Sequence, residues 1–331
     1  MNRRNRGKWI RTAALMLAAL TLCACAAQDQ SSVTGETATP IPTATTVPTV
    51  TPAPTPIPTT APEETPTATP EPTVAYVAQA VCIADEYVNI RAEAGKNADA
   101  LGKLPAGKTA NVISYDDGWA NIEYDGIVGY VSRDYMIRLQ SPEIAVPSGD
   151  WMMILVNKQS LLPDDFTVST ADFQGGEVDA RILDICKQMF ADAKEDGVTF
   201  KLVDAYRSFK TQSALYEKKV QSYIAQGYSR ADAEVKAATI TARPNTSEHQ
   251  TGLALDVVTP SYTKRDKGFA KTRAFKWLEA NAANYGFIMR YPDGKTDITG
   301  VIFEPWHWRF VGTEAAKAMK ASGECLEEYL D

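Results

Sequence analysis

SEHQTGLALD occupies residues 247–256 and contains one of only two histidines in a chain of 331 residues. The other, His307, lies in the sequence EPWHW at residues 304–308. Both have acidic neighbours, since Asp256 follows His249 by seven positions and Glu304 precedes His307 by three. Either histidine taken alone is typical of a capping, surface or packed residue. Because the chain spends both of its histidines beside acids, the two segments together predict one metal site.

A zinc hydrolase needs three protein ligands and an open position for water. His249, Asp256 and His307 provide two imidazoles and a carboxylate. The spacing between His249 and Asp256 fits a loop that enters a strand, with Gly252 allowing the chain to turn. It differs from the helical pair of His-Glu-x-x-His enzymes, in which the histidines are four residues apart.

The segment around Pro305 carries the predicted proton acceptor. In a flat strand, Glu304 and His307 would face opposite sides, so we expect a bend at Pro305 that turns both toward one cavity. Zinc makes water acidic enough to attack near neutral pH. A neighbouring carboxylate takes the proton and passes it to a leaving amine. Glu304 is predicted for this role, with Glu248 as the less favoured alternative.

These motifs resemble those of a known enzyme family. SEHQTGLALD and EPWHW are similar to the Ser-x-His-x-x-Gly-x-Ala-x-Asp and Glu-x-x-His motifs of the VanY/VanX-type zinc D,D-carboxypeptidases. DAYRSFKTQSALY, at residues 204–216, resembles that family's Tyr-Arg-Ser segment with its downstream Gln. YGFIMRYP, at residues 285–292, resembles its Tyr-Gly-Phe strand. The resemblance covers about residues 150–320, with the four motifs in order.

The resemblance implies a role for each motif residue. His249, Asp256 and His307 would bind Zn²⁺ and Glu304 would be the catalytic base. Arg207 would stabilise the oxyanion, a task that suits the forked donors of a guanidinium. From the residues alone, a surface ion pair explains Arg207 equally well. The remaining predicted substrate contacts are Ser247 and Gln212, which would hold the terminal carboxylate, and Tyr291, which would form a pocket wall.

The implied reaction is removal of C-terminal D-alanine from peptidoglycan stem peptides. Two alternatives stay open within this interpretation. The same motifs serve L,D-carboxypeptidases and some endopeptidases, which differ in pocket shape. A different class of protein, a cell-wall-binding lipoprotein without catalytic activity, would keep the fold but release no product.

The pattern around the motifs predicts that residues 150–331 form an α+β zinc peptidase domain. Apolar residues at helical spacing, including Val178, Ile182, Ile185 and Met189, predict a helix that ends before Gly197. Further helices are expected after Ser208, after Ser229, at 272–283 and from 313 onward. Strands are expected at 198–203, 253–258, 287–291 and 301–310, the last interrupted at Pro305.

Residues 76–140 differ in pattern from the rest of the chain. Five short apolar stretches separated by Gly-containing turns predict a small all-β barrel N-terminal to the peptidase domain. The succession of VNIRAEAG, GKLPAGK and DDGWANIEYDGIVGYVSRDYM resembles bacterial SH3-like domains. The resemblance implies binding to cell-wall peptides or glycans, and a spacer without a ligand fits as well.

The N-terminal residues predict export and a lipid anchor. Five basic residues precede an apolar stretch at 12–22 that is short for a membrane span, which indicates a signal peptide over residues 1–24. The sequence LCAC resembles a lipoprotein lipobox with Cys25 as the lipid acceptor; an ordinary cleavage site near Ala26 or Ala27 is the alternative. The Thr- and Pro-rich residues 25–75 predict a disordered linker. The resemblance to a lipobox therefore predicts a protein outside the cytoplasm, anchored to the outer face of the cytoplasmic membrane.

Charge and cysteine content exclude other classes. Removal of residues 1–24 takes away five basic residues and changes the net charge from −7 to −12, which argues against a nucleic-acid partner. Beyond the leader, Cys82, Cys186 and Cys325 remain, an odd number without metal-ligand spacing. We therefore expect no disulfide framework, and buried thiols at Cys82 and Cys186.

Overall fold

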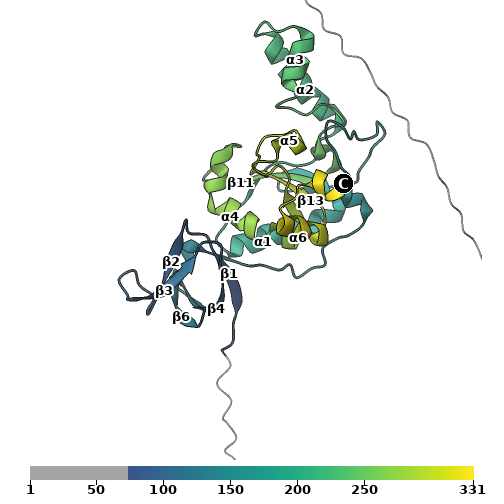
Figure 1. The fold of residues 1–331 in the computed structure, drawn as a ribbon. Coiled ribbons are helices and arrows are strands. Elements are labelled where there is room, and N and C mark those ends of the chain that lie inside the picture. Colours follow the sequence, from purple (N-terminus) through teal and green to yellow (C-terminus); the bar gives the residue numbers. More distant parts are fainter. Residues whose placement is uncertain (1–73) are drawn as a thin grey trace, which may run out of the picture. The chain divides into compact units, whose positions relative to one another are not determined.

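The computed structural model describes residues 74–331 (Figure 1). The predicted signal peptide, Cys25 and all but the last two residues of the predicted linker lie outside these residues. Between residues 74 and 331, no helix is long and apolar enough to cross a membrane. The three cysteines in this part of the chain, Cys82, Cys186 and Cys325, are free and buried.

The N-terminal part of the described chain is one antiparallel sheet in the order β3-β2-β6-β5-β4-β1-β7. Each of the five expected strands is present, and β1 and β7 pair with each other in addition. Side chains that alternate along the strands, such as Ile90, Leu104 and Val112, fill its core. The strands are β1 (Ala78–Cys82), β2 (Tyr87–Arg91), β3 (Ala100–Pro105), β4 (Thr109–Asp116), β5 (Trp119–Tyr124), β6 (Ile127–Ser132) and β7 (Met136–Arg138).

The C-terminal part contains a four-stranded sheet in the order β10-β11-β13-β12, in which all neighbours are antiparallel. Its strands are β10 (Lys201–Asp204), β11 (Ala254–Val258), β12 (Phe287–Met289) and β13 (His307–Phe310), and a separate hairpin is formed by β8 (Thr170–Phe173) and β9 (Gly176–Asp179). The helices are α1 (Leu183–Glu195), α2 (Phe209–Ile224), α3 (Arg230–Ala237), α4 (Arg273–Asn281), α5 (Thr296–Thr299), α6 (Thr313–Ser322) and α7 (Leu326–Leu330).

Six short 3₁₀ helices complete the described elements. The one that matters for the site is η4, which lies directly before β11. They are η1 (Arg133–Tyr135), η2 (Asp150–Met153), η3 (Ala180–Ile182), η4 (Glu248–Thr251), η5 (Lys267–Lys271) and η6 (Ala282–Tyr285).

One face of the four-stranded sheet packs into the main core. Leu255 of β11 lies opposite Trp308 of β13, and both belong to a buried cluster that includes Met189 of α1 and Trp277 of α4. Side chains alternate between the two faces of a strand. The neighbouring residues of Leu255 and Trp308 in the strands therefore face the opposite side, where a polar site forms.

Two expected elements were wrong in extent. The predicted helix with Val178 begins only at Leu183, because Val178 pairs with Ala171 in the β8–β9 hairpin. The predicted strand at 301–310 is confined to His307–Phe310, because a turn occupies the residues before it. The helices expected after Ser208 and Ser229 are present, and in each the serine hydroxyl caps the helix by accepting a backbone N–H from three residues later.

Candidate metal centre and active site

Three polar residues lie in a row across three adjacent strands. Asp204 of β10 pairs with Asp256 of β11, and Asp256 pairs with His307 of β13. Residues directly opposite each other in an antiparallel pair place their side chains on the same face. His249 reaches the same place from η4, and the β10-β11-β13 register thereby assembles the predicted site.

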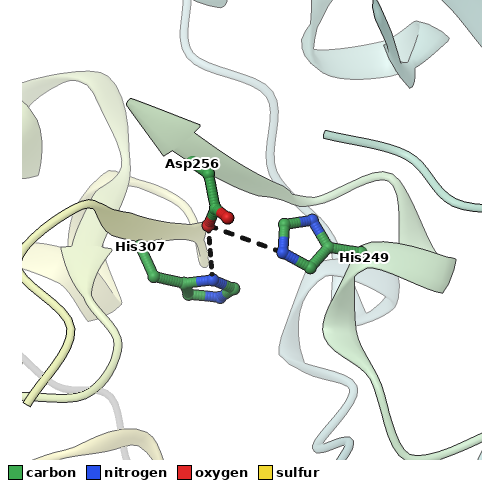
Figure 2. A group of neighbouring side chains, drawn as sticks. All are labelled: His249, Asp256 and His307. Atoms are coloured by element: carbon green, nitrogen blue, oxygen red, sulfur yellow. Dashed lines mark hydrogen bonds and ion pairs between the residues drawn. The ribbon is translucent and has the colours of Figure 1, made fainter. Parts of the chain in front are cut away.

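The structure brings His249, Asp256 and His307 together (Figure 2). One donor atom from each lies within 4.8 Å of the others, and all three residues are buried. Oδ1 of Asp256 is 3.5 Å from Nε2 of His249 and 3.0 Å from Nδ1 of His307. The two rings are nearly perpendicular, with centroids 5.0 Å apart. Among the described residues this is the one group of His, Cys, Asp or Glu with metal-ligand geometry.

A backbone carbonyl fixes the ring of His249. Nδ1 of His249 is 2.6 Å from the carbonyl oxygen of Ala205. A carbonyl accepts only, so Nδ1 carries a proton, and Nε2 is the nitrogen available to a metal beside Asp256. The backbone N–H of Arg207 donates to the carbonyl of His249 at 2.9 Å. The segment after β10 and the segment before β11 thus hold each other through main-chain atoms.

The turn expected at Gly252 is confirmed. Gly252 has a φ of 70°, and a Cβ built on it would lie 2.7 Å from the backbone nitrogen of Asp179. The left-handed conformation and the missing side chain are both required here. This residue redirects the chain from η4 into β11 and sets the distance between His249 and Asp256.

A carboxylate lies behind the ring of His307. Oε2 of Glu248 is 3.4 Å from Nε2 of His307, on the side of the ring away from Asp256. Glu248 is fully buried, and its Oε1 accepts from Arg290 at 2.6 Å and from Arg309 at 3.0 Å. Burial alone would raise the pKa of Glu248, but the two guanidiniums hold it below its usual range. Both oxygens are engaged, which disfavours Glu248 as the mobile base.

The electrostatics of the site favour a cation. Burial alone would raise the pKa of Asp256, but the two histidines hold it well below its usual range. For His307, burial alone would lower the pKa, but hydrogen bonds to Asp256 and Glu248 raise it to about 9. The converging lone pairs and buried carboxylates fit a divalent metal ion.

The expected bend at Pro305 is a tight turn. The backbone N–H of His307 donates to the carbonyl of Glu304 at 3.0 Å, and the indole of Trp308 donates to the carbonyl of Pro305 at 3.1 Å. Proline suits the second position of such a turn. Burial raises the pKa of Glu304, with His307 opposing and Asp256 adding to the shift. The charges of His307 and Asp256 therefore act on the carboxyl of Glu304.

Tyr291 forms part of the wall beside the cluster. Its ring centroid is 4.9 Å from that of His307, with 40° between the planes. Its carbonyl accepts the backbone N–H of Glu304 at 3.1 Å. Ser247, directly before Glu248, is buried, and its hydroxyl makes no hydrogen bond with another residue between 74 and 331. Both residues stay predicted substrate contacts.

Arg207 is held in place by two side chains. Its guanidinium donates to Asp204 from Nε at 3.0 Å and lies 2.8 Å from the same oxygen through Nη2. Nη1 donates to Oε1 of Gln212 at 2.9 Å, while Nε2 of Gln212 donates to the carbonyl of Ala242 at 2.7 Å. Gln212 is fully buried. Its predicted contact with substrate stays untested, and its geometry assigns it to positioning Arg207.

The sequence patterns missed Arg265. Its Nη1 donates to Oδ2 of Asp256 at 2.9 Å and lies 3.9 Å from Asp204. It binds the carboxylate oxygen that does not face the histidines. No sequence motif includes Arg265. Asp204, in contrast, directly follows the predicted strand at 198–203, a position where site residues are expected.

Comparison with known proteins gives two family matches. The VanY model, described as D-alanyl-D-alanine carboxypeptidase, matches residues 176–313, and the model of a bacterial SH3 domain matches residues 86–137. A D-alanyl-D-alanine carboxypeptidase of Enterococcus faecalis is 41% identical over 185 residues, which cover 55% of this chain and 66% of that protein. The putative carboxypeptidase YodJ of Bacillus subtilis is 36% identical over 197 residues, which cover 54% of this chain and 67% of that protein.

Among solved structures, the chain is similar to a D,D-pentapeptidase VanY from a VanB-type resistance cassette, determined in complex with Zn(II). That likeness has a TM-score of 0.49 and 40% sequence identity, and covers 55% of this chain and all of that chain. The two family models match in the predicted order, with the SH3 domain before the peptidase domain, and both relatives are named as carboxypeptidases. The chain therefore belongs to the VanY family of D-alanyl-D-alanine carboxypeptidases and carries a bacterial SH3 domain before its peptidase domain.

Proposed function

We propose that this protein is a zinc-dependent D,D-carboxypeptidase that removes C-terminal D-alanine from peptidoglycan stem peptides. The observation that carries the proposal is the buried convergence of His249, Asp256 and His307, with Arg207 beside it. The names of the relatives support the same activity, and the related VanY structure binds Zn(II).

The residues present fit a zinc ion. His249 through Nε2, Asp256 through Oδ1 and His307 through Nδ1 would hold it, and three such ligands leave a position for water. When bound, zinc supplies a Lewis acid that lowers the pKa of water toward 7.

Two side chains then transfer the proton of the attacking water and stabilise the negative charge on the scissile carbonyl oxygen. Glu304 takes a proton from the attacking water and delivers it to the nitrogen of the departing D-alanine. Arg207, fixed by Asp204 and Gln212, binds the scissile carbonyl oxygen as its negative charge grows. Water is added across one C–N bond, and D-alanine leaves as the free amino acid.

Muropeptides test the proposal directly. Purified full-length protein is incubated separately with pentapeptide and tetrapeptide muropeptides, and the products are weighed by mass spectrometry. The proposal expects loss of one alanine from the pentapeptide and an unchanged tetrapeptide. Trimming of the tetrapeptide alone would instead identify an L,D-carboxypeptidase, and bound zinc without any product would identify a binding protein.

The proposal includes a lipid anchor at Cys25 on the outer face of the cytoplasmic membrane. The basic residues, the apolar stretch at 12–22 and the LCAC sequence support it. A diacyl lipid supplies the two chains that stable anchoring requires. Cys25→Ser should move the protein from the membrane fraction to the medium; a variant that stays with the membrane contradicts the anchor.

The SH3 domain is proposed to hold the enzyme at the cell wall. The match over residues 86–137 supports a domain of that type. Deletion of residues 76–140 should reduce co-sedimentation with purified peptidoglycan while soluble pentapeptide is still trimmed. Equal co-sedimentation of the deleted and full-length proteins would leave the domain as a spacer.

A further inference from the structure

Glu248 has no part in the proposed chemistry, yet it is among the most buried charges of the protein. Its carboxylate is inaccessible to solvent, as are the guanidiniums of Arg290 and Arg309 that bind its Oε1. A buried charge is costly unless it is paired and hydrogen-bonded. Because this buried ion-pair cluster lies next to the predicted metal ligands, we ask what it does for them.

The two histidines present different nitrogens to the cluster. His249 directs Nε2 at Asp256 because its Nδ1 donates to a carbonyl. His307 directs Nδ1 at Asp256, and its Nε2 faces Oε2 of Glu248. An imidazole that binds a metal through one nitrogen carries its proton on the other, and the partner of that proton fixes the ring.

The carboxylate of Glu248 is held in place by its two arginine partners. Arg290 contacts Glu248 through Nε and Glu327 of α7 through both terminal nitrogens, each at 2.7 Å. Arg309 donates to Glu248 and also to the carbonyls of Met152 and Ile154. With two guanidiniums on Oε1, the free direction of Glu248 is Oε2, which faces His307.

We propose that Glu248 is a positioning residue that accepts the Nε2 proton of His307 and so holds Nδ1 toward the metal. This rests on the proposed function, because it assumes that zinc is the ion bound. Glu248 neither touches substrate nor ligates the metal. It makes His307 a fixed and more basic ligand, in the same way that the carbonyl of Ala205 fixes His249.

Zinc affinity tests the proposal through a matched pair of variants. Glu248→Gln should weaken zinc binding about 10- to 100-fold, the range typical of such outer partners. Asp192→Asn is the control: its buried carboxylate, in α1, is bound by Tyr285 and Gln188 away from the site. Zinc affinity is measured by competition with a chelating dye on full-length protein without a histidine tag.

The control should bind zinc like the wild type. A Glu248→Gln variant that folds and binds zinc as tightly as the wild type overturns the proposal. A wild-type protein that binds no zinc overturns the proposed function itself, so the two failures are distinguishable.

The histidine rings provide a test that needs no variant. The chain contains only His249 and His307, so ¹⁵N-histidine labelling of the zinc-loaded wild type gives four ring-nitrogen signals. The proposal expects opposite tautomers: a proton on Nδ1 of His249 and on Nε2 of His307. Two identical tautomers, with both rings protonated on Nδ1, would overturn it even where Glu248→Gln fails to fold.

Discussion

The two halves of the metal centre are held by different kinds of atom. His249 lies in a 3₁₀ turn, and a main-chain carbonyl fixes its ring. His307 begins a strand, and its ring is backed by the side chain of Glu248. A main-chain partner survives any substitution that preserves the backbone, whereas a side-chain partner is lost by one change. The His249 half is therefore robust to mutation of its partner, and the His307 half is sensitive.

The largest effect is expected when a ligand itself is removed. His249→Ala leaves two protein ligands at the centre, so the variant should lose stoichiometric zinc and turnover of pentapeptide. Metal content by mass spectrometry and D-alanine release measure the two losses. Retention of one zinc per chain would contradict the ligand set, however well the backbone of that half is held.

Glu304→Gln removes the proton acceptor beside His307 and leaves all three metal ligands in place. The amide keeps the shape of the turn but accepts no proton, so kcat should fall about 10²- to 10⁴-fold. Zinc content should equal that of the wild type, because Glu304 is not a ligand in the proposed set. An active Glu304→Gln enzyme would remove Glu304 from the role of base.

Gly252→Ala tests the backbone of the His249 half. The methyl group meets the backbone nitrogen of Asp179, and the φ of 70° becomes unfavourable. We expect a loss of about 2 kcal/mol in the free energy of unfolding, from the left-handed conformation and the contact together. Urea denaturation measures it, with Gly294→Ala as a control, since Gly294 also has a positive φ but open space around it. An equal loss in both variants would show that the contact contributes nothing.

The smallest effect is expected at the partner of His249. Ala205→Gly keeps the carbonyl that accepts from Nδ1, so zinc affinity should change by less than about threefold, against 10- to 100-fold for the partner of His307. The chelator competition used for Glu248→Gln applies unchanged. If Ala205→Gly weakened zinc as much as Glu248→Gln, the contrast between the two halves would disappear.

The sequence predicts the three metal ligands more fully than the side chains that hold those ligands in place. The spacing from His249 to Asp256, the turn at Gly252 and the bend at Pro305 are local features, and the chain adopts each of them. The strands predicted at 253–258 and 301–310 also contain Asp256 and His307, although the second strand is shorter than expected.

The supporting contacts were beyond local reasoning. The sequence marks Glu248 only as an alternative base, because nothing local indicates that Arg290 and Arg309 enclose it. Arg265 belongs to no motif and meets Asp256 only through tertiary structure. The contacts of Gln212 with Arg207 and with the carbonyl of Ala242, thirty residues away, also depend on tertiary structure, so its motif alone predicts only a substrate contact.

The pairing of Asp256 with His307 has a consequence for how the sheet forms. A slip of one residue between β11 and β13 would set Trp308 against Asp256 and turn His307 into the apolar core. Only the correct alignment brings the donors together, so a bound metal favours that alignment over every shifted one. At a hundred times its dissociation constant, such a ligand adds about 2.7 kcal/mol to the state that binds it. The bound ion would thus stabilise the correct register of β11 and β13, in addition to its role in the reaction.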